Sequence, residues 1–109
     1  MAATWTPGVL ADGTLSGALA DMFVVPSGEI WRIDACNVAN TTAGVLALTL
    51  ALNPRTAGTD RTIIAARNIG VSKDDLCAEA IGQYIEGGGK LRGLGNGLSY
   101  FVSGLKIVP

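Results

Sequence analysis

The chain has 109 residues, of which 49% are hydrophobic and 16% are charged, and its formal net charge is −1. This length predicts one domain, with enough chain to bury a core without the help of metals or disulfides. The sequence contains no block of like charge and no long apolar run, so it predicts neither nucleic-acid binding nor a membrane span.

Residues 1–13 are expected to form an irregular N-terminal arm outside a domain of residues 14–109, because the dipeptides PG and DG interrupt any regular pattern. The arm carries three large apolar side chains, those of Trp5, Val9 and Leu10. A tryptophan in such an arm either packs under its own domain or anchors on a neighbouring molecule. The sequence favours neither alternative. No basic segment leads into an apolar core here, so we expect no signal peptide.

Two strand regions are predicted next, over residues 14–25 and 30–40, with an interruption at Gly17 and a turn at the sequence PSGE between them. Alternation predicts that the second strand has two distinct faces. One face is expected to carry Trp31, Ile33 and Ala35, and the other Arg32, Asp34 and Cys36.

The clearest strand signal is the run VLALTLAL over residues 45–52. Its four leucines alternate with small residues, so they are predicted to line one face of a strand and to face a core. Residues 54–60 then form a polar loop. Residues 61–69 are predicted to be a strand whose face carries Ile63, Ala65, Arg67 and Ile69.

The C-terminal third is expected to hold three more strands. The first is placed at residues 76–85, with a short helical turn at 72–77 as the alternative, and the second at 91–94 after a triple-glycine turn. The sequence GNG predicts a hairpin into the last strand, residues 98–108, in which Gly104 indicates a bulge or a close backbone approach. The fold predicted is all-β, an antiparallel β-sandwich resembling a jelly roll with about seven to eight strands.

Residues for catalysis or metal binding are scarce. Histidine is absent, which removes the commonest general base and metal ligand. The GGGK sequence lacks the serine or threonine that a phosphate loop needs after its lysine. Cys36 and Cys77 are expected to be reduced, buried core residues, with a disulfide as the alternative. We therefore predict no enzyme, no cofactor and no metal site.

Two parts of the chain resemble small virion proteins of tailed bacteriophages. The first is VPSGEIWRI at 25–33 followed by NVANTT at 37–42 and the leucine strand, and the second is IEGGGKLRG at 85–93 followed by VSGLKI at 102–107. Together they cover about residues 25–108. The resemblance implies a β-sandwich assembly subunit without enzymatic activity, of the kind found in capsid decoration (cement) proteins and in tail or baseplate components.

The first functional hypothesis is therefore a decoration protein on the capsid exterior, made in the host cytoplasm, with the major capsid protein and copies of itself, a trimer being favoured, as partners. Trp5, Val9 and Leu10 are the candidate anchors, and Arg55 and Arg61 the candidate polar contacts at the rim. The alternative is a tail, baseplate or fibre component, including a glycan-binding module. Its candidate aromatic residues are Trp31, Tyr84 and Tyr100, although Trp31 is also expected in the core.

Overall fold

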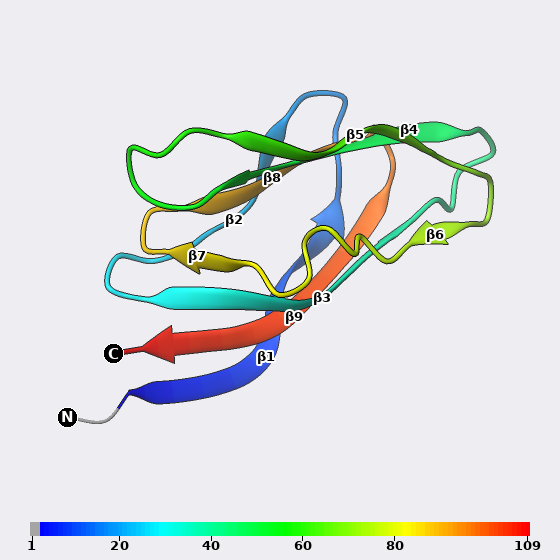
Figure 1. Ribbon diagram of the computed structural model, residues 1–109. Coiled ribbons are helices and arrows are strands. Elements are labelled where there is room, and N and C mark those ends of the chain that lie inside the picture. Colours follow the sequence, from blue (N-terminus) through cyan, green and yellow to red (C-terminus); the bar gives the residue numbers. More distant parts are fainter. Residues whose placement is uncertain (1–2) are drawn as a thin grey trace.

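The computed structural model describes residues 3–109, which form nine strands and no helix (Figure 1). The strands lie in two antiparallel sheets packed face to face, so the all-β sandwich prediction is confirmed. Sheet A has the order β1-β9-β3, with β6 and β7 both along the far side of β3, and sheet B has the order β2-β8-β4-β5. The strands are β1 (Thr4–Thr14), β2 (Ala20–Val24), β3 (Ile30–Ala39), β4 (Leu46–Asn53), β5 (Arg61–Ile69), β6 (Asp74–Asp75), β7 (Tyr84–Glu86), β8 (Lys90–Leu94) and β9 (Ser99–Val108).

The connectivity is that of a jelly roll. Strand β1 pairs with β9, β2 with β8, β3 with β6 and β7, and β4 with β5. The chain thus resembles one long hairpin that is rolled up on itself. Its successive strand pairs belong alternately to sheet A and to sheet B. Since β6 and β7 share one position beside β3, the nine strands fill eight positions. No helix in residues 3–109 is long and apolar enough to cross a membrane.

The leucine run forms β4 in the middle of sheet B and supplies the centre of the core, as predicted. Leu48 and Leu50 have no exposed surface, and Leu52 is 6% exposed. Ile33 and Val38 of β3 are equally buried in the same apolar cluster. The core therefore lies between the two sheets, where the inner faces of β3 and β4 contribute to one cluster.

Two β-bulges change the predicted faces of β3 and β5. On β3 the register shifts between Ile33 and Ala35, so Ala35 is exposed and Cys36 is buried, the reverse of the prediction. A bulge adds one residue to a strand and therefore reverses every side chain beyond it. Gly104 faces this bulge, and a Cβ there would collide with the Arg32 carbonyl oxygen, which confirms the predicted close approach.

On β5 the register shifts opposite Thr49, and Ala66 has a left-handed backbone with φ 46°. Ile64 and Ile69 are consequently buried, whereas Ile63 is only half-buried and Ala65 is exposed. The prediction that Ile63, Ala65, Arg67 and Ile69 share one face is therefore wrong. The N–H of Ala66 donates to Thr49 Oγ1 at 3.2 Å, which gives the bulged backbone a partner.

The prediction of an irregular arm is wrong for the described part of residues 1–13, because Thr4–Thr14 is strand β1, paired with β9 from Thr4 opposite Val108 onward. Met1 and Ala2 lie outside the described residues. The proline of the PG dipeptide is compatible with β1 because this strand is an edge strand of sheet A, where a missing N–H need not interrupt the sheet. Both ends of the described chain thus lie side by side (Figure 1).

The predicted strand at residues 76–85 is also wrong. Residues 77–83 are not in strands, and only the short strands β6 and β7 flank them. Ser72, Cys77 and Gly82 have positive φ values of 59°, 48° and 85°, which end a strand and are equally incompatible with the alternative helical turn at 72–77. The strand expected at 14–25 is limited to β2, because Thr14 still belongs to β1 and residues 15–19 connect the sheets.

The GNG sequence forms a turn, but not the predicted hairpin. Leu98 N–H donates to the Gly95 carbonyl at 2.9 Å, and Gly97 has the positive φ of 100° that this turn needs. The strands on either side, β8 and β9, belong to different sheets. The turn therefore carries the chain across the sandwich, an outcome that local turn chemistry does not distinguish from a hairpin.

Candidate functional site

The described residues contain no cluster of acidic, cysteine or histidine side chains that could hold a metal ion. Several carboxylates are instead paired with arginines. Arg67 of β5 contacts Asp75 at 3.1 Å and also pairs with Glu79. The hydrogen bond from Arg67 holds the pKa of Glu79 below its usual value. These ion pairs connect β5 of sheet B to the segment beside sheet A, so we assign them a structural role.

The most unusual surface lies on the outside of sheet A. On β9, Phe101, Leu105 and Ile107 alternate with Val102, which belongs to the core, so these three side chains face outward. Register places Trp5 opposite Ile107 and Tyr84 in the same row as Leu105. We define the sheet A outer face by Trp5, Val9, Tyr84, Phe101, Leu105 and Ile107.

This face exposes three large aromatic side chains. Trp5 is 57% exposed, Tyr84 54% and Phe101 46%. Leu105 and Ile107 are buried although they are not members of the core cluster, because neighbouring side chains on the outer face surround them. Exposed aromatic side chains gathered on one face are typical of a site where another macromolecule binds.

Charged side chains also lie on this face. Arg32 of β3 contacts Asp34 at 2.7 Å. Hydrogen bonds to Asp34 and to the Tyr84 hydroxyl raise the pKa of Arg32, so it stays a cation. Arg55 contacts Glu86 of β7 at 3.1 Å, with both side chains exposed. Register places Arg32 between Leu105 and Tyr84 and Asp12 opposite Phe101, so charged side chains lie among the aromatic ones on this face.

The structure divides the residues that the sequence singled out for an interface. Trp5 and Val9 both lie on the sheet A outer face. Leu10, at the irregular point of β1, is 7% exposed and packs into the protein's own core. Arg55 is close to β7 through its pairing with Glu86, whereas Arg61 begins β5 in sheet B.

Sequence reasoning named Tyr84 among the exposed aromatic candidates but missed Phe101, Leu105 and Ile107 on this face. The available signal was β9 itself, which carries apolar residues on both faces although only one face of a two-layer sandwich meets the core. Tyr84 could not have been placed in this way, because its strand was predicted over the wrong residues.

The aromatic residues considered for glycan binding do not converge. Trp31 is 7% exposed. The centroid of its ring lies 5.2 Å from that of the Phe23 ring, and Lys106 Nζ lies 4.6 Å from the same Trp31 centroid. The indole N–H donates to Glu29 at 2.9 Å. Trp31 is thus a core residue, as the sequence also indicated. Tyr100 is half-buried and packs against the core cluster, whereas Tyr84 is on the outer face.

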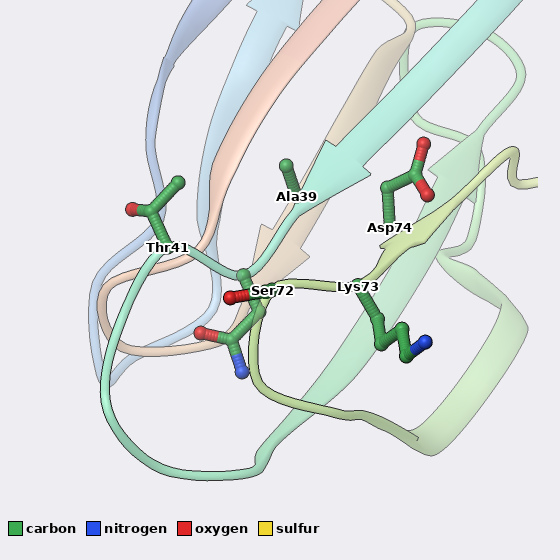
Figure 2. Close-up of a pocket in the computed structure, with 6 residues that line it drawn as sticks. Ala39, Thr41, Ser72, Lys73 and Asp74 are labelled. Carbon is green, nitrogen blue, oxygen red and sulfur yellow. The ribbon is translucent and has the colours of Figure 1, made fainter.

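A shallow depression of about 450 Å³ lies where β3 ends beside β6 (Figure 2). Its lining residues are Ala39, Asn40, Thr41, Ser72, Lys73 and Asp74. Figure 2 shows the Lys73 and Asp74 side chains directed to opposite sides, so they do not converge on a common point. Its polar groups are not arranged as a catalytic pair.

Asn40, at the base of this depression, is used structurally. Its side-chain amide donates to the Gly44 and Ile69 carbonyls at 2.8 and 2.9 Å, and its Oδ1 accepts from Thr42. At 1% exposure the Asn40 side chain is inaccessible to solvent, and its hydrogen bonds hold the turn that follows β3.

Comparison with solved structures finds the same fold in virus particles. The chain matches a chain of the T13 infectious bursal disease virus particle over 96% of its own length and 30% of that chain, with 14% identity and a TM-score of 0.55. It matches the structure of the Gx strain of that virus over 98% of this chain and 33% of the other, with 15% identity and a TM-score of 0.52.

The protein therefore spans about a third of the length of these viral chains, and the likeness concerns the fold. No protein-family model matches the sequence. No curated protein matches it either. The fold is thus a β-sandwich that also occurs in the chains of a virus particle.

Proposed function

We propose that this protein is a non-enzymatic structural subunit of a tailed-phage virion, a decoration (cement) protein that binds the outside of the assembled major capsid shell. The observation that carries the proposal is the sheet A outer face, where Trp5, Tyr84 and Phe101 are about half exposed over the buried Leu105 and Ile107. Tryptophan and tyrosine are the residues that most often dominate the binding energy of protein interfaces.

The viral assignment is supported by two independent likenesses. The fold is shared with chains of a virus particle, and residues 25–108 resemble small tailed-phage virion proteins. The phage context, the capsid position and a trimeric state come from the second likeness alone. We place the major capsid protein opposite the sheet A outer face, because its exposed aromatic side chains suit a surface that is buried on assembly.

The mechanism is stabilisation by binding. A subunit that binds the assembled shell, and not its dissociated subunits, stabilises the shell by its own binding free energy at every site that it occupies. No chemical step is required. An exposed aromatic side chain need only enter a pocket on the shell, while charged groups such as Arg55 and Glu86 stay at the rim.

The test uses virus particles produced without this protein, to which the purified full chain is added. We expect the chain to sediment with the particles at saturable stoichiometry and to raise the temperature at which the shells open. Sedimentation of the free chain reports whether it is a trimer. A chain that shows no affinity for the shells, or that is found on the tail of complete particles, contradicts the capsid assignment.

A further inference from the structure

The two cysteines of the chain lie opposite each other in the core. Strand β3 pairs with β6 in the register Val38 to Asp75 and Ala39 to Asp74. Cys36 lies two residues before Val38 and Cys77 two residues after Asp75, so both cysteines follow the last pair on the same side. Cys36 is 2% exposed and Cys77 has no exposed surface, and both belong to the core cluster.

The two thiols interact with each other. A hydrogen bond between the side chains of Cys36 and Cys77 lowers the pKa of Cys36, and the same bond, together with burial, raises the pKa of Cys77. The Cys77 backbone is held by its N–H, which donates to Asp75 Oδ1 at 2.7 Å. Its Sγ lies 3.6 Å from the Asp75 carbonyl oxygen. Both thiols are free in the structure.

We propose that Cys36 and Cys77 are a disulfide-forming pair that bonds β3 to the segment at residues 70–83 when the protein meets a disulfide-class oxidant such as oxidised glutathione. The Cys36 thiolate attacks one glutathione sulfur and releases a first molecule of reduced glutathione. The Cys77 thiolate then attacks the Cys36 sulfur and releases the second. Two protein thiols are oxidised, and one oxidised glutathione becomes two reduced molecules.

The location explains what such a bond would do. Sheet A has no continuous strand beyond β3, since β6 contributes two residues, β7 three, and the residues between them form turns. This side of the sandwich is therefore joined to β3 by few backbone hydrogen bonds. A bond between residues 41 positions apart would restrict the unfolded chain and hold this segment in place. Because the thiols are buried, the exchange takes place during folding or after this segment opens.

The test is to refold the reduced full-length chain with oxidised and reduced glutathione, and separately with reduced glutathione alone. After oxidative refolding we expect the monomer to lose the mass of two hydrogen atoms and to show no thiol reactive under denaturing conditions. Its melting temperature should exceed that of the reduced form by roughly 5 °C or more. Cys77→Ala is the matched control, since it keeps Cys36 but can form only a mixed disulfide.

Both thiols remaining free after oxidative refolding would overturn the proposal. A disulfide between two chains, seen as a dimer that reductant dissociates, would overturn it equally. Should the Cys77→Ala chain fail to fold, the mass and thiol titration of the unaltered protein still decide between these outcomes. The result is independent of shell binding, so it does not depend on the decoration function.

Discussion

The outer surfaces of the two sheets differ sharply although both cover the same core. The sheet A outer face exposes Trp5, Tyr84 and Phe101 above buried aliphatic side chains. On the outside of sheet B, by contrast, Arg92 contacts Asp21 at 3.0 Å and Asp60 at 2.8 Å. A surface of paired charges is well suited to water, whereas an extended apolar surface gains free energy when another molecule covers it.

The electrostatics of sheet B support this contrast. The hydrogen bond from Arg92 lowers the pKa of Asp60 and raises that of Arg92, so both remain ionised in water. Lys90 adds a further cation 3.9 Å from Asp21. Two sheets that cover one core thus present different outer surfaces, and the outward residues of β9 and of β8 produce that difference.

The largest expected effect concerns the core that both faces share. Leu50→Ala removes a fully buried side chain from β4 and should lower the free energy of unfolding by about 2–5 kcal/mol. Urea unfolding measures this loss. Leu76→Ala is the matched control, because Leu76 is 67% exposed and should change stability little. Equal losses from the two variants would show that the core has been placed wrongly.

The next effect concerns the link between the sheets at Asn40, whose amide joins the end of β3 to the last residue of β5. Asn40→Ala leaves the Gly44 and Ile69 carbonyls without this donor, so we expect a loss of about 2–3 kcal/mol in the free energy of unfolding. Asn68→Ala, an exposed asparagine on β5, is the control. A stable Asn40→Ala variant would contradict this structural role.

A negative charge placed on each outer face in turn tests which sheet binds the shell. Trp5→Glu should weaken binding to shells that lack this protein by about tenfold or more, because a buried carboxylate without a partner is costly at an interface. Thr62→Glu, an exposed position opposite Ala51 on the outside of sheet B, should leave the affinity within about twofold. The reverse ranking would assign binding to sheet B.

The smallest expected effect is that of acid. The pKa values of Asp60 and Glu79 are lowered in the folded protein by their arginine partners. Burial raises the pKa of Asp75, but hydrogen bonds from the Cys77 N–H and Arg67 outweigh it, so its pKa is lowered too. Carboxylates of this kind stabilise the fold above their unfolded pKa values of roughly 4. This contribution is lost as the pH falls through their folded values.

Melting temperatures recorded from pH 7 down to pH 3 measure this loss. Arg67→Gln removes the partner shared by Asp75 and Glu79, so it should reduce the pH dependence as well as the stability at pH 7. Since these side chains are largely exposed, added salt should also weaken the effect. A variant with an unchanged pH profile would show that these pairs contribute little.

The sequence predicted those parts of the fold in which local periodicity and the core agree. The leucine run became β4 with Leu48 and Leu50 buried, and Gly104 marked a close approach between strands. It failed where a single residue changes the register. The extra residues in β3 and β5 reverse the faces beyond them, and bulges depend on the partner strand rather than on local composition.

The candidate surface could be predicted only in part. Trp5 and Val9 were singled out for their apolar character, and they are indeed exposed, but within strand β1 rather than in an arm. Their neighbours on β9 and β7 come from the other end of the chain. Only the closing of the long hairpin, β1 against β9, brings them together, and no short stretch of sequence encodes that pairing.

The most direct test of the contrast between the faces is a cryo-electron microscopy reconstruction of shells decorated with the purified chain. Our account predicts that Trp5, Tyr84 and Phe101 contact the major capsid protein while Arg92 and its aspartates face solvent. Density that places the outside of sheet B on the shell, with the sheet A outer face open to solvent, would contradict it.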